Sequence, residues 1–412
     1  MADSIVTIKS NAKKLAKMAA ADLADSVQFF KAARKVSKDE FKSDASGHAP
    51  GDTISVRIPP MYTVGTTSFD LTSALQDIKE RAVDLPLDKI ATIGFDLDSQ
   101  QLAHDIDVGA VYERFVQPAI KAMAASVENQ MLQKATQATY NLVGTAGSTV
   151  VDPDTVLAGR ERMNKYLCPQ DNRHFLMDST AMRSAVNANK NLFVFGKKEY
   201  GQGYIGDALG YSWMENELLY NHTNGTDVSG IAVDDAAVAT GASTIHLDGI
   251  TTGTGTLTKG TVFTIANVYA VHPQTKQSLG FLQPFTVTAN VTASGVSDAD
   301  VAISPTIYSS ASGSLQNVDS LPADDATVTI LTGSASTAYK QSLMFHKEAF
   351  RVCSVPLVLP VRAEFAEQAT EDGVNIAIIR DFDVLTRKMI TRLDFLGGLV
   401  AVRPEWACRV TA

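Results

Sequence analysis

The longest stretch of helical periodicity lies between residues 107 and 141. Asp105 and Asp107 can cap its N-terminus, and Gly144 follows it as a stop signal. Such a helix would be about 50 Å long, and Pro118 is expected to bend it because proline removes one backbone donor. Its apolar side chains recur every three or four residues, which places them on one face: Val108, Val111, Tyr112, Phe115, Val116, Ala119, Ile120, Met123, Val127 and Met131.

A second amphipathic helix is predicted over residues 10–35, with Ser10 as its cap. Three lysines lie off its apolar face: Lys13, Lys14 and Lys17. We interpret this helix as packed on a neighbour with a solvated lysine face. An arm that docks on another subunit and a helix on a membrane surface are the alternatives.

Alternating residues predict two strands before the long helix. In Thr53–Ile58 the aliphatic side chains point one way and Thr53, Ser55 and Arg57 point the other way, until Pro59–Pro60 ends the strand. A further strand is expected over Ile90–Asp98. We expect the two strands to form a long two-stranded excursion that returns to the foot of the helix.

Short alternating elements follow the long helix. Asp154 is expected to cap a helix that includes Val156, Leu157, Met163 and Leu167 and stops at Pro169. His174–Asp178 is predicted as a strand that leads into a helix over Ser179–Ala188, and Trp213 is an apolar anchor after a glycine-rich stretch.

The pattern changes at His222. From there to about Tyr339, Thr, Ser, Gly, Val and Ala dominate, and alternating runs such as 261–271, 285–292 and 327–330 are separated by turn residues. This pattern predicts a small sandwich or barrel. Because a mixed apolar pattern resumes at Ser342 and includes a strand near 374–379, the β segment reads as an insertion in another fold.

Composition limits the function classes. The 412 residues are 45% hydrophobic and 20% charged, which is typical of a globular protein with two or three domains. We expect no membrane span and no signal peptide, and three widely separated cysteines favour a reducing compartment. The net charge of −9 argues against nucleic-acid wrapping by the whole surface.

One motif suggests enzymatic chemistry. Asp96 and Asp98 follow an apolar run and resemble the nucleophile and general acid of haloacid-dehalogenase-type phosphatases, which use Mg²⁺. The simpler interpretation places both carboxylates on the polar face of a strand, since no doubly wound pattern follows. This interpretation is preferred, and no catalytic residue is assigned.

No cofactor or metal site is predicted either. Gly201, Gly203 and Gly206 match the spacing of the dinucleotide fingerprint, but no buried strand precedes them, so they are read as turn glycines. The seven histidines are scattered, and none has the local spacing of a metal site.

Several stretches, in this order, resemble major capsid proteins of the HK97 fold, in particular the P22-like coat proteins of tailed phages that carry an inserted I-domain. These stretches are 51–64, similar to the entry of the E-loop, 174–183, 206–216, 345–350, 354–360 and the closing segment Arg392–Glu405.

The resemblance implies an α+β fold with an N-terminal arm (1–45), an E-loop (46–98), a P-domain with a spine helix (99–150, with parts of 343–390), an A-domain and return to the P-domain (151–221 and 343–412), and an I-domain (222–342). It implies a structural protein, not an enzyme. A Mg²⁺-dependent phosphatase and a β-rich tail or adhesion component are the alternatives.

The resemblance also implies partners. The chain would form hexamers and pentamers of an icosahedral head around double-stranded DNA, starting from a procapsid with scaffolding and portal proteins that later expands. It leaves room for a decoration protein and gives no role to a membrane. The expected location is the virion, after assembly in the bacterial cytoplasm. Lys13, Lys14, Lys17, Arg57 and Pro118 are the hypothetical assembly residues.

Overall fold

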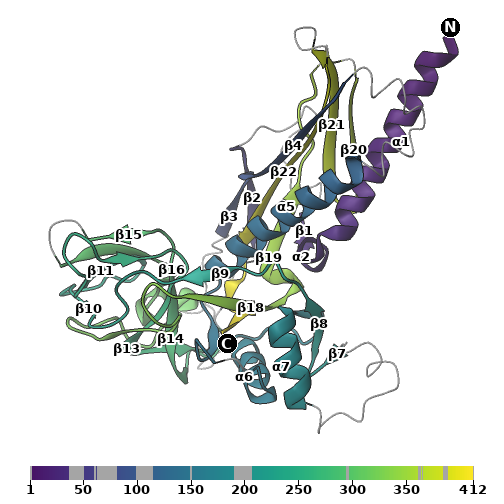
Figure 1. Cartoon of the computed structure of the whole chain (residues 1–412). Helices are drawn as coiled ribbons and strands as arrows, with labels where there is room; N and C mark the ends of the chain where they lie inside the picture. Colours follow the sequence, from purple (N-terminus) through teal and green to yellow (C-terminus); the bar gives the residue numbers. More distant parts are fainter. Residues whose placement is uncertain are drawn as a thin grey trace, which may run out of the picture. The chain divides into compact units, whose positions relative to one another are not determined.

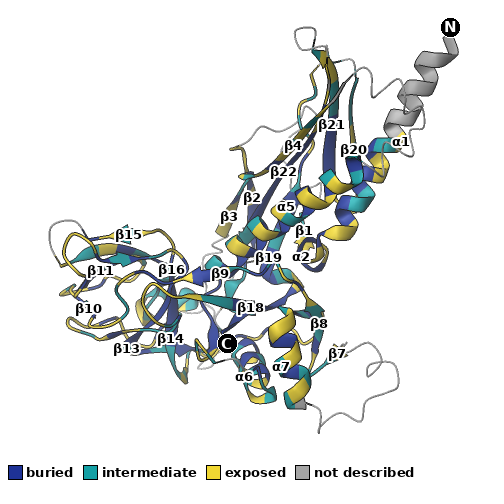
Figure 2. Ribbon diagram, in the orientation of Figure 1, coloured by how far each residue is buried: buried dark blue, intermediate teal, exposed yellow. Residues whose placement is uncertain are grey.

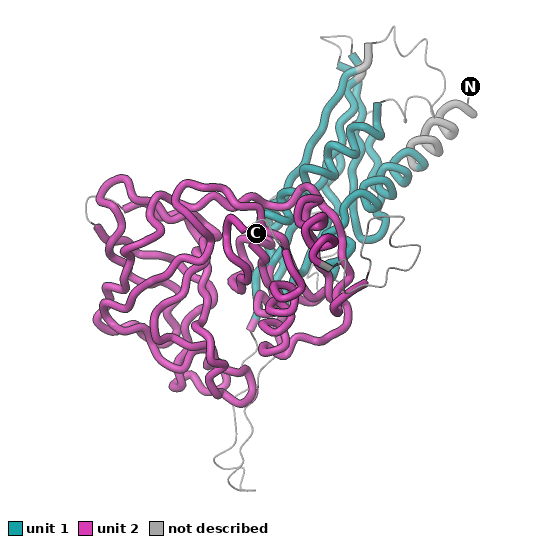
Figure 3. The backbone as a smooth tube through the Cα atoms, turned by 60° about the horizontal axis from the view of Figure 1, so that its bottom comes forward, with its two compact units in different colours: residues 1–56, 82–134, 350–400 teal, residues 57–81, 135–349, 401–412 magenta. Residues whose placement is uncertain are grey.

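The computed structural model describes residues 2–36, 51–59, 62, 81–98, 115–148, 151–189, 207–293, 297–360, 363, 365–383 and 388–411. The chain forms two compact units, each built from segments that are distant in sequence (Figure 3). Unit 1 contains residues 1–56, 82–134 and 350–400, and unit 2 contains residues 57–81, 135–349 and 401–412.

Unit 1 is organised around a six-stranded sheet with the order β1-β19-β22-β21-β20, in which β4 also pairs with β22 (Figure 1). Its longest strand, β22, runs antiparallel to both β21 and β4. The strand bounds are β1 (Arg34–Lys35), β4 (Lys89–Asp98), β19 (Phe350–Ser354), β20 (Phe365–Glu371), β21 (Val374–Asp383) and β22 (Lys388–Ala401).

The N-terminal helix packs on this sheet through small apolar side chains. Helix α1 (Ala2–Ser26) contacts β20 and β21, and its buried face includes Ala16, Ala19, Ala20 and Leu23 (Figure 2). The single helix predicted over 10–35 is wrong in its extent. The extended backbone of Val27 ends α1, and a separate short helix, α2 (Gln28–Ala32), follows.

The described part of the long helix is α5 (Gln117–Ala138). Its 22 residues span about 33 Å, and Val116, Ile120, Met123, Val127 and Met131 are buried as the periodicity predicted. Residues 107–114 of the predicted helix lie outside the described residues. Pro118 is the second residue of α5 and follows a π-helical turn at Phe115–Val116.

The predicted end of this helix is wrong. The helix ends at Ala138, and Leu142–Gly144 forms strand β5, which pairs in parallel with β23 (Ala407–Thr411). Gly144 is therefore not a helix stop. It ends a strand with a φ of +88°, a conformation that side chains with a Cβ disfavour.

The pairing predicted for the excursion is also wrong. Strand β2 (Thr53–Ile58) has the expected alternation, with Ile54, Val56 and Ile58 buried and Arg57 exposed. However, it pairs with β3 (Arg81–Pro86), a strand that the pattern analysis did not detect. Strand β4 instead pairs antiparallel with β22, and this pairing makes β4 part of the large sheet of unit 1.

Unit 2 contains a seven-stranded sheet with the order β5-β23-β18-β6-β8-β7, in which β9 also pairs with β18. Helices α6 (Pro153–Lys165) and α7 (Ser179–Asn189) share a core with this sheet, around Phe175, Trp213 and Met344. The remaining strands are β6 (Arg173–Met177), β7 (Asp207–Ala208), β8 (Tyr211–Glu215), β9 (Asn221–Thr223) and β18 (Ala338–His346).

Some details of α6 differ from the prediction. Its cap is Asp152, whose Oδ1 accepts a hydrogen bond from the Thr155 N–H at 2.9 Å, and Asp154 lies in the first turn. Leu157 is 43% exposed because the core-facing stripe instead contains Val156, Gly159 and Met163. Leu167 is 41% exposed and lies beyond the helix, which ends at Lys165 and does not continue to Pro169 as predicted.

The β segment (residues 222–342) begins within β9 and has its own core, which includes Phe263 and Phe285 with ring centroids 5.9 Å apart. It forms one sheet with the order β10-β11-β16-β14-β13-β17 and a pair, β12-β15. The runs 261–271 and 327–330 correspond to the single strands β13 and β17, whereas the run 285–292 is divided between β14 and β15. The strand bounds are β10 (Ala232–Val233), β11 (Ala242–Asp248), β12 (Thr256–Leu257), β13 (Val262–Val271), β14 (Ser278–Val287), β15 (Val291–Thr292), β16 (Ala299–Ile307) and β17 (Val328–Ile330).

Within the described residues, no helix combines the length and the apolar character needed to cross a bilayer.

Candidate functional site

Among the described residues of unit 2, Arg409 makes an extensive set of side-chain hydrogen bonds; it lies on β23 and is fully buried. Its three guanidinium nitrogens donate to five acceptors. Nε donates to the Thr139 carbonyl at 2.6 Å, Nη1 to the Gly260 carbonyl at 2.6 Å and Gln341 Oε1 at 3.1 Å, and Nη2 to the Gln137 carbonyl and Thr286 Oγ1, both at 3.2 Å.

This arrangement joins three parts of unit 2. The carbonyls of Gln137 and Thr139 lie at the end of α5, where helix carbonyls lack intrahelical partners. Gly260 and Thr286 belong to the β segment. Arg409 therefore fastens the β segment to the C-terminal strand and to the helix end.

The charge of Arg409 is retained although burial lowers its pKa to about 9. All five of its acceptors are neutral carbonyl, amide or hydroxyl oxygens. A planar guanidinium can reach five acceptors in fixed directions, which an ammonium cannot do. The site thus acts as a directional structural clamp.

His222 lies beside this clamp and is also fully buried. Its Nε2 is 3.1 Å from Asn224 Oδ1 and 3.4 Å from Thr261 Oγ1. Burial, and then the positive charge of Arg409, lower the pKa of His222 to about 4. His222 is therefore neutral at physiological pH, and protonating it would oppose the buried charge of Arg409.

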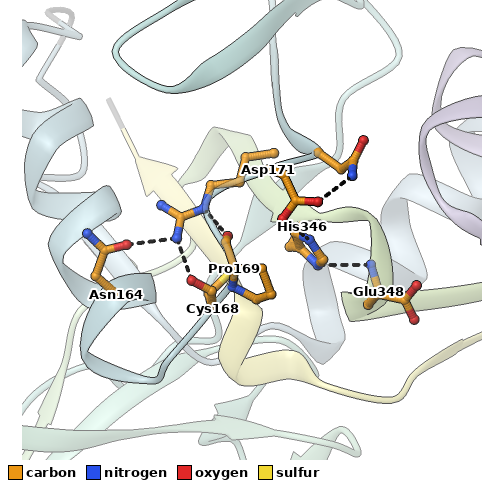
Figure 4. A network of polar contacts seen from close by, with 8 residues as sticks. Asn164, Cys168, Pro169, Asp171, His346 and Glu348 are labelled. Atoms are coloured by element: carbon orange, nitrogen blue, oxygen red, sulfur yellow. Dashed lines mark hydrogen bonds and ion pairs between the residues drawn. The ribbon is translucent and has the colours of Figure 1, made fainter.

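A second network holds the end of α6 (Figure 4). Arg173 donates to the carbonyls of Pro169 and Cys168 at 2.6 and 2.7 Å and to Asn164 Oδ1 at 2.7 Å. Nearby, His346 Nδ1 accepts the Glu348 N–H at 3.2 Å. These bonds hold the turn that follows α6, so this network also has a structural role.

In unit 1, a carboxylate connects two helices. Glu128 of α5 is buried, and its Oε1 accepts the Phe29 N–H of α2 at 2.8 Å. Lys134, farther along α5, forms an ion pair with Asp88 at 3.0 Å. These contacts attach the N-terminal segment and the start of β4 to the long helix.

The hypothetical assembly residues lie on three separate elements. Lys14 and Lys17 are exposed on α1, Arg57 is exposed on β2, and Pro118 is exposed at the start of α5. The side chain of Lys13 lies outside the described part of the chain. Among these residues with described side chains, Lys14 and Lys17 share an element, and the other two lie on elements of their own.

Asp96 lies on an exposed strand face and not in an enclosed pocket. It forms an ion pair with Lys388, and the hydrogen bond from Lys388 lowers the pKa of Asp96. In the β4–β22 register Ile390 lies opposite Asp96 and Lys388 lies opposite Asp98, so Lys388 reaches Asp96 diagonally. This is the solvated strand face that the simpler interpretation predicted.

Comparisons with known proteins identify the class. A sequence profile described as "P22 coat protein - gene protein 5" matches residues 29–409. The capsid of the cyanophage P-SCSP1u is 14% identical with a TM-score of 0.42, over 92% of this chain and 89% of that chain. The capsid of Ralstonia phage GP4 is 8% identical with a TM-score of 0.43, over 92% and 87%.

A further solved structure, the CUS-3 coat protein I-domain, is 30% identical with a TM-score of 0.20, over 26% of this chain and 100% of that chain. Among curated proteins, no sequence matches this chain.

The chain is a phage coat protein, and its fold is of the α+β class. It belongs to the P22 coat protein family, whose profile spans most of its length. It is therefore a structural protein of the virion that assembles into a capsid lattice, and the phosphatase and tail-component alternatives are wrong.

Sequence reasoning did not single out Arg409 or Glu128. Arg409 is the charged residue of the otherwise apolar or small segment Ala407–Thr411, whereas Glu128 stands between Val127 and the polar Asn129 and has no such contrast. That contrast is the available signal, but it does not reveal the partners, which lie 68 to 272 residues away for Arg409.

Proposed function

We propose that this coat protein forms hexamers and pentamers of an icosahedral head that encloses double-stranded DNA. Assembly begins with a procapsid, built with a scaffolding protein around a portal in the host cytoplasm, and the shell then expands. Membership of the P22 coat protein family over residues 29–409 carries this proposal.

We also propose the five-part division given above, with an N-terminal arm (1–45), an E-loop (46–98), a P-domain, an A-domain and an I-domain (222–342). The separate apolar core of the β segment supports its assignment as an inserted domain.

The N-terminal arm is proposed to present a basic face to scaffolding protein or DNA. Its small apolar side chains are buried where the helix contacts β20 and β21, whereas Lys14 and Lys17 are exposed. Lysine ammonium groups bind acidic surfaces and phosphates as point charges. Arg57, exposed on β2, is proposed to act in the same way toward a neighbouring subunit.

Pro118 is proposed to mark the point where the long helix changes shape during expansion. It follows a π-helical turn, and π-turns and prolines are common causes of helix bending. Two arrangements of this helix would supply a two-state element of the kind that shell expansion requires. If Pro118→Ala leaves both expansion and shell curvature unchanged, this part of the proposal is wrong.

The test of assembly is to express the full chain with and without the scaffolding protein from the same phage. The fast-sedimenting fraction is then examined by negative-stain microscopy. Closed shells, spirals or tubes built from capsomers are expected. A chain that stays a 44.1 kDa monomer with the scaffolding protein present would overturn the proposal.

The basic face is tested in the same system by the double variant Lys14→Glu/Lys17→Glu. We expect reduced scaffold incorporation or reduced DNA packaging. Lys259→Glu is the control, since it reverses an exposed lysine in the β segment. Normal heads from the double variant would contradict the role of the arm and leave shell formation itself unaffected.

A further inference from the structure

Side chains from neighbouring strands surround His246 on the outer face of the β segment. Ile245 and Leu247 are buried, so His246, which lies between them on β11, points to the other face. The register places His246 opposite Asp300 of β16, and the Asp234 N–H donates to the His246 carbonyl at 3.0 Å. Three adjacent segments thus bring Asp234, His246 and Asp300 to one level of the sheet.

The two imidazole nitrogens have different surroundings. His246 Nδ1 lies 2.8 Å from Asp300 Oδ1. His246 Nε2 lies 3.2 Å from Asp298 Oδ2 and 4.0 Å from Asp234 Oδ2. One ligand atom each from Asp234, His246 and Asp298 lies within 4.8 Å of the other two.

We propose that Asp234, His246 and Asp298 form a binding site for a divalent transition-metal ion of the Zn²⁺ type. Ligand atoms about 2.0–2.1 Å from a tetrahedral ion are about 3.3 Å apart. The separation of 3.2 Å between His246 Nε2 and Asp298 Oδ2 already matches this value. The Asp234 side chain is 56% exposed, so it can rotate inward to complete the set.

Asp300 has a separate role in this site. Its carboxylate accepts a hydrogen bond from Nδ1–H, which keeps Nε2 turned toward the other two acids, and a bound ion would replace the proton that Nε2 shares with Asp298. Metal-ligating histidines commonly have such a carboxylate partner, which orients the ring and raises its basicity. Asp300 is therefore a positioning residue and not a ligand.

The donor set also selects the kind of ion. Mg²⁺ and Ca²⁺ prefer oxygen ligands alone, whereas an imidazole nitrogen with carboxylates suits Zn²⁺ and similar ions. A bound ion would offset the repulsion among the acids and connect the segments that carry them. Because these segments come together only in the folded chain, binding would stabilise the β segment.

The proposal does not depend on shell formation, so it is tested on tag-free, folded full-length chain, whatever its assembly state. Zn²⁺ is titrated calorimetrically, and thermal unfolding is compared with Zn²⁺ and with EDTA. We expect saturable binding near one ion per chain and a higher Tm with Zn²⁺. Mg²⁺ at the same concentration should have little effect.

Matched variants separate ligands from bystanders. His246→Ala and Asp298→Asn should abolish the calorimetric binding and the Tm rise. Asp300→Asn should weaken binding about 10–100-fold, which is the usual effect of losing an orienting partner. Asp324→Asn removes an exposed acid elsewhere in the β segment and should bind as the parent chain does.

Two results would overturn the proposal. One is the absence of saturable Zn²⁺ binding by the parent chain, which would leave His246 as an ion-paired surface residue. The other is undiminished one-to-one binding by both His246→Ala and Asp298→Asn. Circular dichroism of each variant without metal checks that the β segment has folded.

Discussion

The Glu128 carboxylate accepts the backbone N–H of Phe29 at 2.8 Å, although the two residues are 99 positions apart in sequence. Both are almost completely buried, and the Phe29 ring lies 5.7 Å from the Phe350 ring between centroids. The N–H of Phe29 belongs to the first turn of α2, where helix N–H groups lack intrahelical partners. A side chain from the long helix thus supplies the cap that α2 does not provide for itself.

Replacing Glu128 should therefore loosen the attachment of the N-terminal segment. We expect Glu128→Ala to lower the free energy of unfolding by about 1–3 kcal/mol, because it leaves a buried N–H without its acceptor. Glu128→Gln keeps an oxygen acceptor of similar shape and should cost less. Urea unfolding measures both variants, and equal losses would show that the hydrogen bond to Phe29 is unimportant.

Arg409 should tolerate no conservative replacement. Arg409→Lys keeps a positive charge, but its ammonium has three donors for the five acceptors, so buried oxygens would lose their partners. We expect a loss of more than about 3 kcal/mol in the free energy of unfolding, at about 1–3 kcal/mol for each buried group left unsatisfied.

Arg403→Lys is the matched control for Arg409→Lys. Arg403 lies in the same C-terminal segment, is partly exposed, and stacks on Trp406 with its guanidinium carbon 4.4 Å from the ring centroid. Its replacement should cost about 1 kcal/mol or less. Thermal unfolding compares the two variants, and similar losses would contradict the assignment of Arg409 as a clamp.

Alanine substitutions at Gly144 and Gly147 distinguish backbone strain from a steric clash of the added Cβ. Both have positive φ, +88° and +84°, so alanine is strained at each position by about 1–2 kcal/mol. A Cβ at Gly144 would also lie 2.3 Å from the Thr411 carbonyl oxygen, whereas at Gly147 its nearest contact is a Tyr339 ring carbon at 3.5 Å.

We therefore expect Gly144→Ala to destabilise unit 2 clearly more than Gly147→Ala, because it forces β5 away from β23. Chemical denaturation of both variants measures the difference. If the two variants have the same free energy of unfolding, then backbone strain alone determines the effect, and close packing of the two strands does not.

The lowered pKa of His222 predicts that the stability of the folded chain depends on pH. Its folded-state pKa of about 4 lies below the ordinary value of 6.5, so below pH 6.5 the unfolded chain binds a proton that the folded chain does not. The stability from this residue is complete above pH 6.5 and is lost as pH falls from 6.5 to about 4. The full loss is about 3 kcal/mol.

The measurement is the pH dependence of Tm for the parent chain and for His222→Gln, which cannot titrate in this range. The half-buried His174 and the buried His346 also have lowered pKa values, so the parent chain and the variant both lose stability in acid. The difference between them isolates His222. Parallel curves from pH 7 to pH 4.5 would mean that the pKa of His222 is not lowered in the folded chain.

The sequence alone determined the type and approximate position of most elements. The 3–4 spacing along α5, the alternation in β2 and the turn-rich β segment each reflect which side chains must leave water. These are local properties, so they can be read without knowing what covers each face. The order of the same stretches also supported the resemblance to P22-like coat proteins, which the family profile confirms.

Tertiary structure decided which elements meet. β2 pairs with β3 and not with β4, since several registers bury an alternating strand equally well. The five acceptors of Arg409 and the acids around His246 come from residues far apart in sequence, and local spacing rules do not detect them. The spacing of apolar residues along the sequence indicates which face of an element is apolar. Only the packed chain brings particular polar atoms within hydrogen-bonding distance of one another.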